Sequence, residues 1–265
     1  MTRVDEIDFE IIGEDLQAVI VTLDPGEAMV AEAGAFMYMD DGIEMATKTS
    51  FSDNKGMWGK LMEAGKRAIT GESFFITMFA NGAQQRRTVA FGAPYPGRVI
   101  PLELGDIGGT MICQKDCFLC GARGINVDIA FQRKIGVGLF GGEGFIMQKI
   151  TSASGRGQVF LHAGGTILEK QLAPGEVLRV DTGCIVGMQP SVQYDIQTVP
   201  GIKNKLFGGE GLFFAVLRGP GHVWLQTLPF SRLADRVVSS APSHGGSSRG
   251  EGSVLGGLGR LLDGN

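Results

Sequence analysis

Short runs of apolar residues recur along the chain at a nearly constant distance. Three runs, 74–79, 145–150 and 212–217, are apolar at nearly every position, which is typical of strands that are covered on both faces. Each run follows a Gly-Glu turn, and the glutamates of these turns lie about 71 and 67 residues apart. A fixed period of this kind predicts that one small β unit is repeated three times. The three glutamates are Glu72, Glu143 and Glu210.

A proline-glycine turn ends an earlier strand in the first and third units. The turns are Asp24-Pro25-Gly26-Glu27 and Ala173-Pro174-Gly175-Glu176, and the second unit retains the pattern only in part. Proline followed by glycine favours a type II β-turn, in which the glycine has a positive φ angle. A glycine-bearing hairpin and a return strand close each unit. The predicted units span 15–97, 98–165 and 166–230.

These patterns predict an all-β fold for a single domain over residues 1–230. We expect three β-sandwich or β-roll modules that share a core around a pseudo-threefold axis, because a single module of about 65 residues is only marginally stable. Sheet edges that remain unpaired would favour assembly between chains, so a homo-oligomer is one expectation.

The first unit carries about eleven extra residues, which fall between 53 and 69. Trp58 and its apolar neighbours recur there at helical spacing, with basic residues between them. We therefore expect one short helical insertion. It is either a lid that packs on the sheet or a helix that docks on a partner or a membrane surface, as Trp58 and the basic flank favour.

The C-terminal region differs from the repeats. A short amphipathic segment is expected at 231–238, followed by a flexible Gly/Ser-rich tail at 239–265. The tail ends in an apolar stretch that includes Leu258, Leu261 and Leu262. This stretch is either a docking tip on a tether or a frayed terminus.

Composition excludes few classes of function. The 42 glycines fit many tight turns and bulges, and a formal net charge of −4 opposes a strong electrostatic grip on nucleic acid. The N-terminus lacks the apolar stretch of a signal peptide, and no run is long enough to span a membrane. A cytoplasmic location is expected.

Candidate chemistry is sparse. Cys113, Cys117 and Cys120 fall within eight residues, so they are either zinc ligands without an obvious fourth partner or small buried thiols. With three histidines in the chain, no Ser/His/Asp triad can be assigned, and we expect neither catalysis nor a cofactor. His162 falls on a return strand and is interpreted as a hydrogen-bonded histidine of the sheet.

The Gly-Glu turns allow two interpretations. The segment Gly141-Gly142-Glu143-Gly144 lacks the Gly-Lys-Ser/Thr of a phosphate-binding loop and precedes a strand instead of a helix, so a structural turn is favoured. If the modules surround an axis, Glu72, Glu143 and Glu210 would form a ring that binds a cation or a basic group of a partner.

The chain resembles the altered-inheritance-of-mitochondria family, which includes mitochondrial biogenesis proteins and many bacterial members. The resemblance rests on the turn 172–176, on the paired Leu-Phe-Gly-Gly-Glu-Gly segments at 139–144 and 206–211, and on the glycine-rich return hairpins. It implies a fold similar to the tryptophan RNA-binding attenuator protein (TRAP), a short double-stranded β-helix that assembles in rings. It supplies no catalytic residues.

Together these observations predict a non-catalytic β-rich scaffold or adaptor that acts through protein or membrane-surface contacts. The expected contact residues are Trp58, Leu258, Leu261 and Leu262. The alternative is a small-ligand or metal-binding protein with its site between the repeats. RNA binding is the least favoured function, because the chain is acidic.

Overall fold

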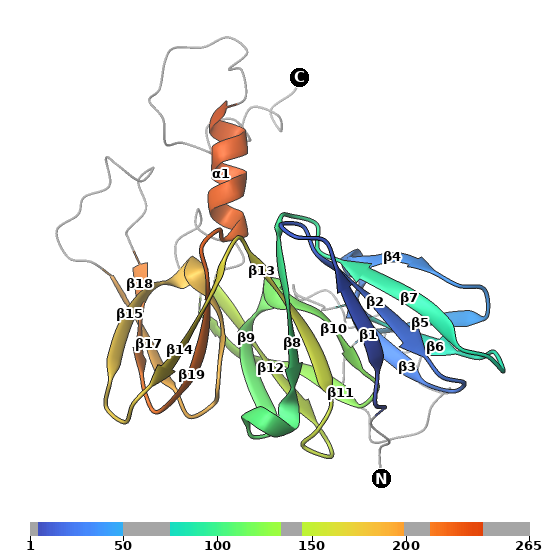
Figure 1. Ribbon diagram of the computed structural model, residues 1–265. Helices are drawn as coiled ribbons and strands as arrows, with labels where there is room; N and C mark the ends of the chain where they lie inside the picture. Colours follow the sequence, from blue (N-terminus) through green and yellow to red (C-terminus); the bar gives the residue numbers. More distant parts are fainter. Residues whose placement is uncertain (1–4, 50–74, 134–144, 199–212, 241–265) are drawn as a thin grey trace.

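The computed structural model describes residues 5–49, 75–133, 145–198 and 213–240, and most of these residues lie in β-strands (Figure 1). The predicted all-β fold class is therefore confirmed. In the described chain the strands form four sheets, which we call A to D. Every pair of neighbouring strands within these sheets is antiparallel.

The four sheets differ in size and in strand order. From edge to edge, sheet A consists of β1 (Asp8–Ile12), β2 (Ala18–Leu23), β7 (Arg87–Gly92) and β4 (Phe36–Met39). Sheet B consists of β5 (Ile43–Thr49), β6 (Phe75–Asn81), β3 (Ala28–Glu32), β10 (Phe118–Ala122), β13 (Gln158–Gly164) and β8 (Gly97–Glu103). Sheet C consists of β11 (Ile125–Arg133), β12 (Phe145–Ser152), β9 (Thr110–Gln114), β16 (Ile185–Met188), β19 (Gly221–Gln226) and β14 (Ile167–Leu172). Sheet D consists of β15 (Val177–Asp181), β18 (Phe213–Arg218) and β17 (Gln193–Thr198).

One pattern of six strands occurs three times in the described chain. In the first module β2-β7-β4 form one half and β5-β6-β3 the other; β8 to β13 and β14 to β19 repeat this pattern as the second and third modules. The pairs β3–β10 and β9–β16 join neighbouring modules, so sheets B and C each contain strands of two modules. The limits of the predicted units, their pseudo-threefold axis and the likeness to TRAP stay predictions.

The sheets stack in the order A, B, C, D, with a hydrophobic core between each adjacent pair. Figure 1 shows the first module at the right, the second in the middle and the third at the left. Consecutive residues of a strand point to opposite faces. Met29 of β3 therefore lies in the core between A and B, and Val30 lies in the core between B and C. The central strands of sheets B and C are covered on both faces, which explains the nearly continuous burial of β10, β13 and β16.

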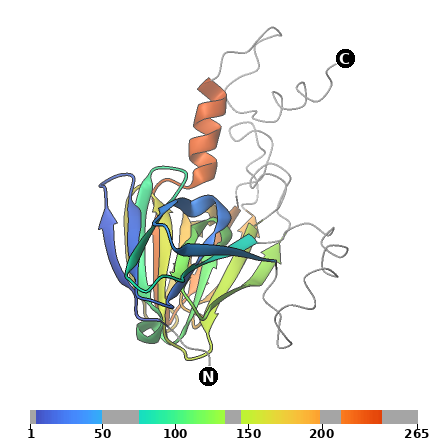
Figure 2. The ribbon, with the colours of Figure 1, turned by 90° about the vertical axis from the view of Figure 1, so that its right-hand side faces the viewer.

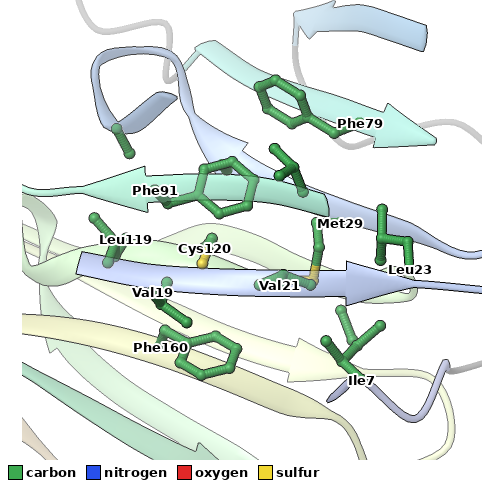
Figure 3. Close-up of a cluster of buried hydrophobic side chains, with 14 of the residues drawn as sticks. Ile7, Val19, Val21, Leu23, Met29, Phe79, Phe91, Leu119, Cys120 and Phe160 are labelled. Carbon is green, nitrogen blue, oxygen red and sulfur yellow. The ribbon is translucent and has the colours of Figure 1, made fainter. Parts of the chain in front are cut away.

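The core between sheets A and B is drawn in Figure 3. On β2, Val19, Val21 and Leu23 alternate with half-buried residues and point into this core. Phe79 and Phe91 meet there in an edge-to-face contact, with ring centroids 5.1 Å apart. This alternation is the expected pattern for a sheet with one buried face.

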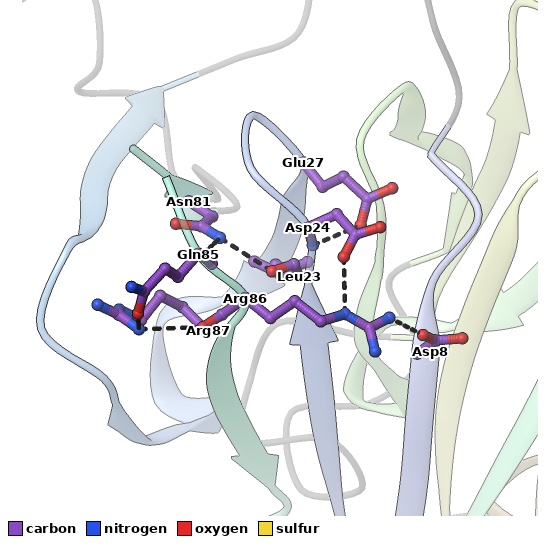
Figure 4. Close-up of polar contacts among 8 residues, drawn as sticks. All are labelled: Asp8, Leu23, Asp24, Glu27, Asn81, Gln85, Arg86 and Arg87. Atoms are coloured by element: carbon purple, nitrogen blue, oxygen red, sulfur yellow. Dashed lines mark hydrogen bonds and ion pairs between the residues drawn. The ribbon is translucent and has the colours of Figure 1, made fainter. Parts of the chain in front are cut away.

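The predicted type II turns are confirmed. Gly26 and Gly175 have φ angles of 80° and 78°. The N–H of the following glutamate donates to the carbonyl three residues earlier, at 3.0 Å in both turns. In the first turn the Glu27 carboxylate also accepts from the Asp24 N–H at 2.9 Å (Figure 4). Asp24 and Glu27, the first and last residues of the turn, are thus joined by two hydrogen bonds.

Asn81 and Arg86 connect this turn to the neighbouring strands. The Asn81 side chain is buried and donates to the Leu23 carbonyl at 2.9 Å (Figure 4). Arg86 forms ion pairs with Asp24 and Asp8 and so links the turn to β1. Both ion pairs are exposed and contribute little to stability.

Helix α1 (Phe230–Ser240) follows the last strand and projects away from the β-sheets, as Figures 1 and 2 show. Its first turn is anchored to the sheets. Arg232 donates to Asp181 at 2.8 Å, and the Phe230 ring lies 5.2 Å from that of Tyr95. The segment 231–238, expected only to be amphipathic, lies within this helix.

Several predicted features lie outside the described residues. They are the helical insertion at 53–69, the three Gly-Glu turns and the tail from residue 241 onward.

Candidate functional site

A groove lies between the second and third modules and has a volume of about 600 Å³. One wall comes from β8, at the outer edge of sheet B, and the other from β14 and β19, at the edge of sheet C. Most of its lining side chains are apolar. The lining residues are Val99, Ile100, Pro101, Leu102, Ile107, Ile167, Glu169, His222 and Trp224.

The polar groups of the groove come from two paired strands. His222 and Trp224 are two residues apart on β19, so their side chains lie on the same face. The imidazole stacks on the indole, with ring centroids 4.2 Å apart and an interplanar angle of 12°. His222 Nε2 lies 3.4 Å from Glu169 Oε2, which makes an ion pair when the imidazole is protonated.

Gln189 holds the backbone of His222 in place. Its side-chain oxygen accepts the backbone N–H of His222 at 2.8 Å, and its nitrogen donates to the Ile107 carbonyl at 3.3 Å. One glutamine therefore connects β19 to Ile107, a lining residue that follows β8 in the chain. This support keeps the imidazole beside Glu169, over a floor formed by the buried Trp224.

The β8 wall opposes the addition of another strand. The N–H groups of Gly97 and Val99 point away from β13, because they donate to Asp15 O and Gln17 Oε1. Pro101 has the same orientation on β8 and has no N–H to donate. An extended peptide would lack a hydrogen bond at that point, so the groove is better suited to a compact apolar ligand.

The groove is mainly apolar and carries few ionisable groups. Among its described lining residues none is serine, cysteine or lysine, and the ionisable groups are one imidazole and one carboxylate. An aromatic or aliphatic ligand would fill the apolar walls, and a donor or cation on it would reach Glu169. A small-ligand or metal-binding site between the repeats is the alternative that the sequence predicts, but none of the lining residues could be named from it. The two walls belong to different sheets and come from strands far apart in the chain.

His162 lies in a second cluster, under the start of α1. Its ring is buried and meets Tyr95 edge to face, with centroids 4.5 Å apart. Burial lowers the pKa of His162 to about 4 and outweighs a contact with the Tyr95 backbone that favours the charged form. The imidazole is therefore neutral at pH 7 and acts as an aromatic core residue.

The cysteines belong to two different cores. Cys113 and Cys117 lie in the core between sheets B and C, whereas Cys120 lies in the core between A and B. All three are free and buried, and burial raises the pKa of each thiol, so they stay neutral. Within the described ranges no group of three or more His, Cys, Asp or Glu side chains is placed to hold a metal ion.

The predicted binding residues cannot be located relative to these sites. Outside the described residues lie Trp58, Glu72, Glu143, Glu210, Leu258, Leu261 and Leu262.

The fold defines a class of protein, namely a layered all-β protein with an apolar groove between two of its modules. The family model for mitochondrial biogenesis AIM24 matches residues 9–228, and the chain belongs to this family. The predicted family is thereby confirmed. No curated protein matches the chain.

The chain is also similar to a protein from Streptococcus pyogenes whose X-ray crystal structure is known. The TM-score is 0.66 at 22% sequence identity, and the match covers 88% of this chain and 98% of the other. This likeness shows that the two proteins share a fold. In the described part of the chain, the helix of 11 residues is too short to cross a bilayer.

Proposed function

We propose that the protein is a non-catalytic scaffold or adaptor that acts through contacts with proteins or with a membrane surface. The observation that supports this function is the exposed apolar face of α1. Phe230, Val237 and Val238 are 50%, 62% and 41% exposed, although they lie on one side of the helix. A helix that leaves such a face in water is suited to bind in a groove of a partner.

The attachment of α1 favours presentation of this face. Arg232 pairs with Asp181, and Phe230 contacts Tyr95, so the first turn is held by the sheets. The later residues Val237 and Val238 lie where the helix extends away from them (Figure 2). The helix is fixed at one end and accessible at the other.

Affinity purification from the native cell tests this proposal. The double variant Val237→Ser, Val238→Ser should lose the proteins or lipids that copurify with the wild type. Asp235→Ser, which leaves both valines in place on the same helix, is the control and should retain them. Equal recovery with both variants would refute a role for this face.

The groove favours small-ligand binding as the alternative function. Its apolar walls and the Glu169–His222 pair would hold an apolar ligand with one donor group. Native mass spectrometry of the protein purified from its own cell should then show an added small mass. The variant Ile167→Trp, which fills the groove, should lose that mass, whereas Leu168→Trp, whose side chain points to the other face of β14, should keep it.

A further inference from the structure

Sheets A and D each correspond to one half of the larger sheets B and C. Sheets B and C each contain six strands that join two modules, in the orders β5-β6-β3-β10-β13-β8 and β11-β12-β9-β16-β19-β14. Placing sheet D before sheet A gives β17-β18-β15-β4-β7-β2-β1, whose first six strands repeat this order for the third and first modules. We propose that β15 of one copy pairs antiparallel with β4 of a second copy and completes this sheet.

The two strands are available for such pairing. Within the described chain β4 and β15 are edge strands, whereas their counterparts in the other modules are paired at the β3–β10 and β9–β16 junctions. Figure 1 shows β4 at the right and β15 at the left end of the molecule. The pairing must therefore occur between copies.

The internal junctions predict the register of the new pair. Cys120 lies opposite Ala31 at the first junction, and Gly187 lies opposite Cys113 at the second. Strands β4, β10 and β16 each have a bulge after their first residue. Regular pairing with β7, β13 and β19 resumes at Tyr38, Cys120 and Gly187, so these three residues are equivalent. By this equivalence Tyr38 of one copy lies opposite Val180 of the next.

Burial supports the same arrangement. Leu119 and Val186 follow the first residue of their strands and are 3% and 0% exposed, because each extends into the core of the preceding module. Their equivalent on β4 is Met37, which is 53% exposed, and its neighbour Tyr38 is 46% exposed. The bulge places two consecutive residues on one face, as Leu119 and Cys120 in the core between sheets A and B show. In the assembly both Met37 and Tyr38 would therefore enter the core between sheets C and D of the neighbouring copy.

Side-chain volumes at the junctions are also matched. On the neighbouring strand Cys120 lies opposite Phe160, Gly187 opposite Trp224 and Tyr38 opposite Ala90. Each pair combines one large residue with one small residue. In sheets B and C the small residue is on the junction strand, whereas in sheet A the large residue is on β4. Tyr38 is thus the large residue that the edge of sheet A would supply to the shared core.

This contact is heterologous, because each copy uses β4 for one neighbour and β15 for the other. Repetition gives a closed ring or an open filament in which the number of modules is a multiple of three. The contact involves neither α1 nor the groove, so it can fail or succeed independently of the proposed function.

Disulfide trapping of the full-length chain tests the register. Equal amounts of the single variants Tyr38→Cys and Val180→Cys should form a covalent dimer when mixed and oxidised. Each variant alone should not, beyond the background of the native cysteines in the wild type. Gln197→Cys, on the far edge of sheet D, is the control partner and should not trap Tyr38→Cys. Equal trapping of both partners, or of neither, would overturn the proposed register.

Light scattering after size-exclusion chromatography tests the assembly itself. The wild type should have the mass of several chains, and Met37→Lys, Tyr38→Lys should reduce it to that of a monomer, because charges on an edge strand oppose pairing. Circular dichroism should show that the variant keeps its β structure, since both side chains are exposed. A monomeric wild type, or a folded variant with unchanged mass, would overturn the proposal.

Discussion

At the scale of single residues, the buried carboxylate of Asp5 attaches the start of the described chain to the first two modules. It accepts the Ala28 N–H and the guanidinium of Arg123, both at 2.9 Å. Ala28 begins β3, and Arg123 directly follows β10, so Asp5 binds next to both strands of the first junction. A buried charge is stable only when such partners are present.

Replacement of Asp5 by alanine should lower the free energy of unfolding by about 3 kcal/mol, because the Ala28 N–H and the Arg123 charge lose their acceptor. Asp5→Asn keeps an acceptor and the volume and should cost less. Urea denaturation at pH 7 measures both. A loss below about 0.5 kcal/mol for Asp5→Ala would show that water replaces the carboxylate.

His162 predicts a dependence of stability on pH. Its pKa is about 4 in the folded protein against 6.5 for a free histidine, so the unfolded chain binds the extra proton between these values. Stability is therefore lost as the pH falls from about 6.5 to 4, by up to about 3 kcal/mol. His162→Phe removes the proton site and keeps an aromatic ring next to Tyr95.

Urea denaturation at pH 7 and pH 4.5 checks this expectation. The wild type should lose more stability than His162→Phe over this interval. Glu32 titrates with the opposite sign, because partial burial and the charge of Asp116 raise its pKa to about 7, so the difference between the two proteins isolates His162. Equal losses would mean that the histidine is not held neutral.

At the scale of elements, the two Pro-Gly turns impose a backbone geometry that other residues adopt at a cost. Gly26 and Gly175 have positive φ angles, and a Cβ atom on either would meet no atom within 4 Å. Their replacement by alanine should therefore cost about 1 kcal/mol each through backbone conformation alone.

Thermal unfolding of Gly26→Ala, Gly175→Ala and the double variant measures this cost. The turns belong to different modules, so the two losses should add in the double variant. Gly26→Asn is the control, because asparagine tolerates positive φ better and should be closer to the wild type. A stabilising effect of alanine would contradict the conformational argument.

Strands and turns could be predicted from the chain, because local chemistry decides them. The run 74–79 corresponds to β6 (Phe75–Asn81), and 145–150 to β12 (Phe145–Ser152). A site between the repeats is an alternative that the sequence predicts, but the residues of the groove could not be predicted, since they depend on how sheet C stacks on sheet B. The cysteine spacing also gave no indication that Cys120 faces a different core from Cys113.

At the scale of the whole molecule, the three modules share sheets and cores, so the stability of one depends on its neighbours. The second module contributes β10, β13 and β8 to sheet B and β11, β12 and β9 to sheet C. Its neighbours complete both sheets, and each core has residues from more than one module. A module that unfolded alone would expose the faces and the edge of its neighbour, so we expect the three modules to unfold together.

Differential scanning calorimetry should accordingly show one transition, with equal calorimetric and van't Hoff enthalpies. Gly187→Val should divide this transition into two. A Cβ at this position would meet the Met111 side chain and would lie 2.8 Å from the Ile112 carbonyl oxygen, so valine would force β16 away from β9. The third module would then melt first. Gly34→Val is the matched control, since a Cβ there meets no atom within 4 Å, and it should keep one transition. Two transitions in the wild type would show instead that the shared sheets do not couple the modules.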